Sequence, residues 1–198
     1  MLQTAPEEWG STMERTWACF DCRFNGAEPI CCRADGSFDP MRVARILLKV
    51  RTTEDDGSDA KLSRMQAYDC VDEMMQVAPD AALAFILVAL DICRTREQVA
   101  LLAAGSLETL LRAHGQKVIG PLEEVARHNA KMRYFLSSTW GQGSIPISIW
   151  RRLIAAIADG PVMDANARTP AAGLDHLVLP AEDVISLLAK PLIKDAVE

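Results

Sequence analysis

Apolar residues recur at helical spacing along most of the chain, and the alternating pattern of a strand is nearly absent. Close to the start, bulky apolar residues follow one another at intervals of three or four positions: Trp9, Met13, Trp17, Phe20 and Phe24. At 100° per residue this spacing confines them to one side of a helix. The pattern predicts a first helix over residues 6–24 and an all-α protein.

Start and stop signals predict the next helices. Asp39 and Pro40 offer an N-cap and a first-turn proline for a helix that runs to about residue 51. A third helix is expected over residues 62–77, and its apolar side is formed by Tyr68, Val71 and Met75. The segment AALAFILVAL, residues 81–90, follows Pro79 and is apolar on every side. A helix of that kind must be surrounded by other helices, so we expect it at the centre of the core.

Further caps and breakers predict short helices in the second half of the chain. Thr95 starts a helix that Gly105 stops, and Ser106 starts another that Gly115 stops. Helical spacing then continues over four segments, residues 116–128, 129–140, 147–159 and 181–190, with an irregular stretch at 159–180.

These segments amount to about eight to ten helices in a single domain that spans residues 1–198. They suit either a compact bundle or a short α-solenoid-like stack of helix pairs, because no internal repeat of fixed period decides between the two. Residues 141–198 would form an extension to a central part at residues 60–140.

The net charge of −6 repels nucleic acid and anionic membrane surfaces, so we expect no direct nucleic-acid or membrane partner. The longest apolar run, of ten residues, is about half of a bilayer span. The first residues lack the basic and then apolar pattern of a secretory signal. We therefore expect a cytoplasmic protein with reduced thiols, whose acidic surface suits a basic protein partner.

Four of the six cysteines lie close together near the start of the chain: Cys19, Cys22, Cys31 and Cys32. A structural zinc site uses two short pairs of cysteine or histidine, and only the first pair has that spacing. The side chains of adjacent cysteines diverge, and Cys19 and Cys22 fall off the apolar side of the first helix. The pattern favours small apolar packing residues and no cofactor, with zinc as the alternative.

No motif for phosphate binding, dinucleotide binding, serine hydrolysis or zinc proteolysis occurs in the chain. His114 and His128 stand at expected helix ends, where the helix dipole favours a cation. Glu108 has the spacing for an ion pair with Arg112 one turn later. The sequence offers no catalytic residues.

The segment LLAAGSLETLLRAHG, residues 101–115, followed by Arg133 and Trp140, resembles an uncharacterised bacterial family. The family pattern is an AAGxLExLLxxHG core and a following helix that ends in Trp. The resemblance implies a helical domain of bacterial or phage-related origin and no particular reaction. Three polar positions match this pattern and are the binding residues that it suggests: Glu108, His114 and Arg133.

The lack of a catalytic constellation, the acidic charge and the helical scaffold favour a non-catalytic protein-binding module. Such a module masks or inhibits a partner protein, as immunity proteins and phage or plasmid inhibitors do. The first alternative is an enzyme or a small-ligand-binding domain with a pocket around Glu108, His114 and Arg133. The second is an adaptor held together by zinc on the N-terminal cysteines.

Overall fold

The computed structural model describes residues 31, 33, 38–49, 60–158, 160–163 and 177–192. These residues form helices and no β-strand, so the expected all-α class is confirmed. The elements are α3 (Pro40–Leu47), α4 (Ala60–Val77), α5 (Pro79–Ile92), α6 (Arg96–Leu102), the π-helical segment η2 (Ala103–Leu107), α7 (Glu108–His128), α8 (Ala130–Leu136), α9 (Ile147–Ile157) and α10 (Ala181–Ala189). The first helix expected over residues 6–24 lies outside the described residues, as does most of the irregular stretch 159–180.

Helix α3 begins where the sequence predicts. The carboxylate of Asp39 accepts a hydrogen bond from the backbone N of Arg42 at 3.0 Å, and Pro40 occupies the first turn, where its missing N–H is not needed. The helix ends at Leu47 rather than near residue 51, because Lys49 adopts a left-handed backbone with φ 53°. A lysine in that conformation costs roughly 1 kcal/mol relative to glycine.

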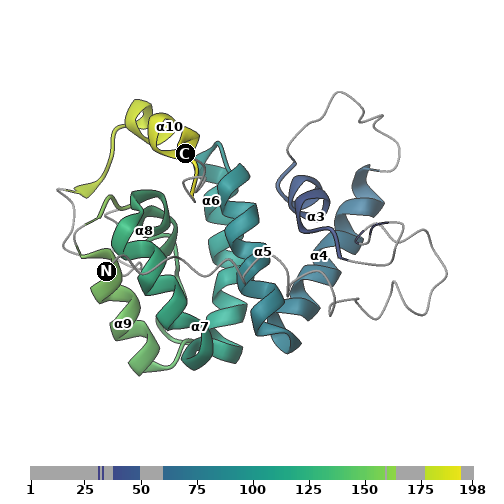
Figure 1. Ribbon diagram of the computed structural model, residues 1–198, viewed down its shortest axis with the longest axis horizontal. Coiled ribbons are helices and arrows are strands. Elements are labelled where there is room, and N and C mark those ends of the chain that lie inside the picture. The colour runs from purple at the N-terminus through teal and green to yellow at the C-terminus, as the bar shows by residue number, and fades with distance from the viewer. Residues whose placement is uncertain are drawn as a thin grey trace, which may run out of the picture.

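Helix α5 lies at the centre of the core. It contacts α3, α4, α6 and α7, and Figure 1 shows it in the middle of the row of helices, between α4 on one side and α7 on the other. Its large side chains Phe85, Ile86 and Leu90 are fully buried. The prediction that residues 81–90 form a helix surrounded by other helices is confirmed.

The apolar side of α4 differs from expectation at Tyr68, which is 54% exposed. The buried residues of this helix are Ala67, Cys70, Val71, Met74 and Met75. At 100° per residue, Tyr68 lies roughly 90° from the middle of that buried side. The expectation that Tyr68 packs beside Val71 and Met75 is therefore wrong.

The chain stays helical from α6 through η2 into α7 and does not stop at Gly105. Thr95 caps α6 as predicted, because its hydroxyl accepts a hydrogen bond from the backbone N of Gln98 at 3.3 Å. Ser106 caps nothing, because it is buried inside η2. Burial of the residues on either side of Gly105 outweighs the loss of about 1 kcal/mol for glycine in a helix, so the expected break is wrong.

Helix α7 is kinked next to Gly115, the second expected stop. The backbone of His114 leaves the helical region, with φ −134° and ψ 21°, so two helical segments meet there. His114 thus ends the first segment, as the sequence predicts, and a second segment follows in place of a loop. Gly115 is buried where α7 crosses α9, and a Cβ added to it would lie 3.0 Å from the side chain of Ile149. The glycine therefore also permits a close approach of two helices.

The remaining helices begin near the predicted positions. The side chain of Asn129 caps α8 by accepting hydrogen bonds from the backbone N–H groups of Lys131 and Met132, at 2.9 and 3.2 Å. Helix α8 ends at Leu136, so Trp140 follows the helix instead of ending it. The hydroxyls of Ser137 and Ser138 donate to the carbonyl of Tyr134 at 2.7 and 3.1 Å and compete with the backbone bonds that would continue the helix.

Buried apolar residues from α3 to α10 form one continuous cluster, so the described helices pack as a compact bundle. In Figure 1, α10 lies at the edge of the molecule beyond α8 and close to α6. A β-bridge between Val162 and Val178 joins the segment after α9 to the segment before α10. In the part of the chain that the structure describes, no helix is long and apolar enough to cross a membrane.

Candidate functional site

Glu108 and Trp140 are 32 positions apart in the sequence and meet in the structure. The backbone N of Trp140 donates a hydrogen bond to Oε1 of Glu108 at 2.5 Å. Trp140 is nevertheless 58% exposed. Because the bond is made by the main chain, it fixes the position of the residue and leaves the indole free to contact another molecule.

The carboxyl of Glu108 is half-buried at the first residue of α7. Burial raises its pKa above the usual 4.5, while the hydrogen bond from Trp140 and the charge of Arg112 partly oppose that shift. Arg112 is exposed, and its Nη2 donates to Oγ1 of Thr109 at 3.4 Å. The ion pair expected between Glu108 and Arg112 is thus replaced by separate contacts for each side chain.

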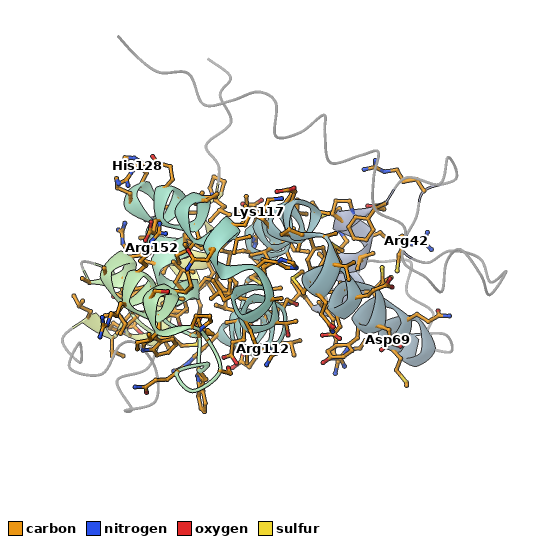
Figure 2. The ribbon with its side chains drawn as sticks, turned by 90° about the horizontal axis from the view of Figure 1, so that it is seen from below. Arg42, Asp69, Arg112, Lys117, His128 and Arg152 are labelled. Atoms are coloured by element: carbon orange, nitrogen blue, oxygen red, sulfur yellow. The ribbon has the colours of Figure 1, made fainter. Side chains whose placement is uncertain are left out.

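We call Glu108 and Trp140, together with the exposed residues Leu101, Ala104 and Arg112, the Trp140 surface. The four residues other than Trp140 recur every three or four positions, the spacing that places side chains along one side of a helix. The surface crosses η2, and π-helical segments occur frequently at functional sites. Figure 2 shows Arg112 on the side of the molecule opposite Lys117, so the other side of α7 does not belong to this surface.

The structure does not bring together the three binding residues that the family pattern suggests. Glu108 contacts Trp140, whereas Nε2 of His114 lies 2.7 Å from the carbonyl O of Gln76. Nη1 of Arg133 donates to the carbonyl O of Ala126 at 2.6 Å. At 1.5 Å per residue, Ala126 lies about 18 Å along α7 from His114, so the three side chains serve three separate contacts.

Lys131 is a buried charged residue that the sequence did not single out, and it is 1% exposed. Its Nζ donates to the carbonyl oxygens of Asp91, Leu188 and Lys190 at 2.9, 3.0 and 3.3 Å. Nη1 of Arg94 donates to two of the same oxygens, those of Asp91 and Leu188, at 2.5 and 3.3 Å. These carbonyls lie at the C-terminal ends of α5 and α10, where cations compensate unpaired acceptors and the helix dipoles.

Two further bonds hold the residues that follow α10. Nδ2 of Asn129 donates to the carbonyl O of Leu192, and the backbone N of Leu192 donates to Oδ1 of Asp91, both at 2.6 Å. We call Asp91, Arg94, Asn129 and Lys131 the C-terminal clamp. The sequence contains one signal for the burial of Lys131. This residue precedes Phe135 by four positions and so falls on the apolar side of α8.

The cysteine hypothesis is tested at one of its four residues. Cys31 is a free, buried thiol, while Cys19, Cys22 and Cys32 lie outside the described residues. Within the described ranges, no group of three or more His, Cys, Asp or Glu side chains could hold a metal ion. Cys70 and Cys93 are buried, as expected for packing residues, and burial raises the pKa of Cys93 to about 12. The zinc alternative stays a prediction.

A family model described as a family of unknown function, DUF6869, matches residues 53–161, which is more than half of the 198 residues. The chain belongs to this family. The expectation of a helical family without an assigned activity is thereby confirmed. Searches of the curated proteins and of the solved structures found no match.

The whole Trp140 surface lies within the DUF6869 match, whereas α3 and α10 lie outside it. Both partners of the bond between Glu108 and Trp140 therefore lie within the match. Lys131 also lies within it, whereas Leu188 on α10, to which Lys131 donates, lies outside. Trp140 was a position of the family pattern, and only the structure shows that it contacts Glu108.

Removal of the Glu108 side chain is expected to loosen Trp140. Glu108→Ala leaves the backbone N of Trp140 without its acceptor and should lower the free energy of unfolding by about 1–2 kcal/mol at pH 7. Glu108→Gln keeps an oxygen acceptor and removes a half-buried charge, so it should be at least as stable as the wild type at pH 7. Urea unfolding of the three proteins measures the difference.

The pH dependence of stability shows whether the charge of Glu108 favours or opposes folding. The pKa of Glu108 is raised in the folded state, so ionisation of this carboxyl opposes folding as the pH rises above 4.5. Below that pH the group is protonated in both states, and the wild type and Glu108→Gln should converge in stability near pH 4. A Glu108→Gln variant as unstable at pH 7 as Glu108→Ala would contradict this account.

Proposed function

We propose that this protein is a non-catalytic module that binds and masks a partner protein, and that the partner docks on the Trp140 surface. The observation that carries the proposal is the hydrogen bond from the backbone of Trp140 to Glu108, beneath a largely exposed indole. The bond fixes the main chain of Trp140, whose large side chain stays exposed. Such a side chain loses little conformational entropy on binding.

The composition of the surface supports this proposal. Tryptophan and arginine are the residue types that most often dominate binding energy at protein interfaces, and Trp140 and Arg112 flank Glu108. Covering the exposed part of an indole removes on the order of 100 Å² of mostly apolar area from water, which is worth roughly 2–3 kcal/mol. A Cβ added to Gly105 would meet no atom within 4 Å, so the backbone next to Ala104 is open to another molecule.

Catalysis is the less favoured alternative, because Glu108, His114 and Arg133 serve separate contacts and do not line one pocket. The proposal includes a cytoplasmic location, in keeping with the free thiols of Cys31 and Cys93. It also includes a protein partner in place of nucleic acid or a membrane, since the whole chain carries a net charge of −6.

The experiment compares Trp140→Ala with Ile185→Ala. Both remove an exposed apolar side chain, and Ile185 lies on α10, outside the Trp140 surface. The tagged wild type is used to recover a partner from the native host, and the purified partner is then titrated by calorimetry. We expect Trp140→Ala to weaken binding by about 30-fold or more, or 2 kcal/mol, and Ile185→Ala to change it less than about threefold.

Two outcomes would count against the proposal. One is the recovery of no stoichiometric protein partner under gentle conditions. The other is a partner that binds Trp140→Ala as tightly as the wild type.

A further inference from the structure

The described residues do not share the acidity of the whole chain. They include 16 Lys and Arg against 12 Asp and Glu, a net charge of +4, whereas the whole chain has 21 against 27, a net charge of −6. The acidic excess is therefore carried by residues outside the described ranges. A cationic patch on the helical bundle is compatible with an acidic protein overall.

Such a patch lies on the outer face of α3. Arg42 and Arg45 are exposed and lie 60° apart around the helix, and the exposed Lys49 follows its C-terminal end. The buried residues Val43, Ala44 and Leu47 point to the opposite side, into the core. We call Arg42, Arg45 and Lys49 the α3 basic face. Figure 2 shows Arg42 at the end of the molecule away from His128 and Arg152.

Local stability accounts for Arg45, a cation in the last turn of α3, but not for Arg42 or Lys49. Arg42 stands in the first turn of α3, where the helix dipole disfavours a cation, and it precedes Arg45 by three positions, so the like charges repel. Lys49 keeps a left-handed backbone that glycine would adopt without strain. Strained residues of this kind persist where a function requires the side chain.

The carboxylate of Asp39, just before α3, is already engaged. Asp39 accepts the backbone N–H of Arg42 and lies 4.0 Å from Nε of Arg33. Its side chain therefore caps the helix and pairs with a further cation. Arg42 and Arg45 are exposed, and a guanidinium can bind a carboxylate with two parallel hydrogen bonds.

We propose that the α3 basic face docks an acidic segment of a partner protein. The positions of the three cations span about 10 Å along the helix, which fits two or three carboxylates on a single turn or short strand. Three cations are too few to hold a nucleic acid or an anionic membrane against the repulsion of a chain with a net charge of −6. A short acidic peptide segment approaches with less repulsion and matches the size of the face.

This docking face goes beyond the proposed function. It lies outside the DUF6869 match and on a different element from the Trp140 surface, so either surface can bind while the other does not. Substitutions of Trp140 and of Arg42 therefore test the two proposals separately.

The probe is a fluorescein-labelled hexaglutamate peptide, titrated against the full chain by fluorescence anisotropy at low and moderate salt. We expect saturable binding that weakens with salt and falls at least tenfold in the double variant Arg42→Glu with Arg45→Glu. The matched control is Arg151→Glu with Lys190→Glu, which makes the same change in net charge at exposed positions elsewhere. The control should lose less than threefold.

A second variant separates binding from stability. Lys49→Gly removes the strained lysine, so it should raise the melting temperature by a few degrees and weaken peptide binding roughly threefold. Unchanged affinity in this variant would overturn the role of Lys49 in the face.

Several results would overturn the whole proposal. They are the absence of peptide binding at millimolar concentration, equal losses in the test and control double variants, and tighter Arg42-dependent binding to duplex DNA or phosphatidylserine vesicles. Binding that occurs only after neutralisation of Glu54, Asp55, Asp56 and Asp59 would assign the face to an acidic segment of this chain and would also overturn it.

Discussion

Lys131→Ala is expected to lower the free energy of unfolding by roughly 2–4 kcal/mol. The side chain is almost fully buried, so its truncation leaves a cavity as well as lost hydrogen bonds. Its Nζ donates to the carbonyls of Asp91, Leu188 and Lys190, which lie at the ends of two helices that are distant in the sequence. Urea unfolding monitored by circular dichroism measures the change.

A matched variant separates the cavity from the hydrogen bonds. Lys131→Met keeps most of the volume and removes only the donors, and Arg94 still donates to two of the three carbonyls. We therefore expect Lys131→Met to cost about 1–2 kcal/mol, less than Lys131→Ala. The double variant with Arg94→Met should cost more than the sum of the single ones, because only then do Asp91 and Leu188 lose both donors to their carbonyls.

The stability difference between the wild type and Lys131→Met should depend on pH, because Lys131 titrates differently in the folded and unfolded chain. Burial lowers the pKa of Lys131 to about 8, the cation of Arg94 adds to this shift, and Asp91 opposes it. The unfolded chain keeps the usual value of 10.5, so it binds more protons than the folded chain between pH 8 and 10.5. The wild type should gain stability relative to Lys131→Met across that window. A difference that is constant from pH 7 to pH 10 would show that Lys131 titrates normally.

Capping residues in the sequence predicted the helix starts that depend only on neighbouring residues. The start of α3 follows from Asp39 and Pro40, and the start of α6 follows from Thr95, because each cap bonds a backbone N–H within the next three positions. The end of α3 and the continuity at Gly105 depend on tertiary packing. Single-residue preferences of about 1 kcal/mol are too small to decide such positions.

The sequence indicated residues of the candidate site but not the contact between them. The family pattern named Glu108 and Trp140 among its positions, and no helical spacing connects residues 32 apart. Lys131 was missed for a different reason. A lysine in the first turn of a helix is usually solvated, and only the carbonyls of α5 and α10, which are distant in sequence, make its burial favourable.

Phe85→Ala is expected to have the largest effect on stability, a loss of about 3–5 kcal/mol. Phe85 has no exposed area, and its ring lies 6.3 Å from the ring of Phe38, just before α3. Leu87→Ala on the same helix removes a partly buried side chain and should cost about half as much or less. Thermal unfolding of both variants measures the difference.

Phe38→Ala removes the other ring of that pair and tests how far α3 depends on the core. Because Phe38 lies two residues before α3, its loss should mainly raise hydrogen exchange at Val43 and Ala44 and leave α7 protected. Phe85 contributes to the centre that α3, α4, α6 and α7 share, so Phe85→Ala should raise exchange in all of them. Identical exchange patterns in the two variants would mean that α3 unfolds only together with the whole bundle. In that case the α3 basic face is as rigid as the core beneath it.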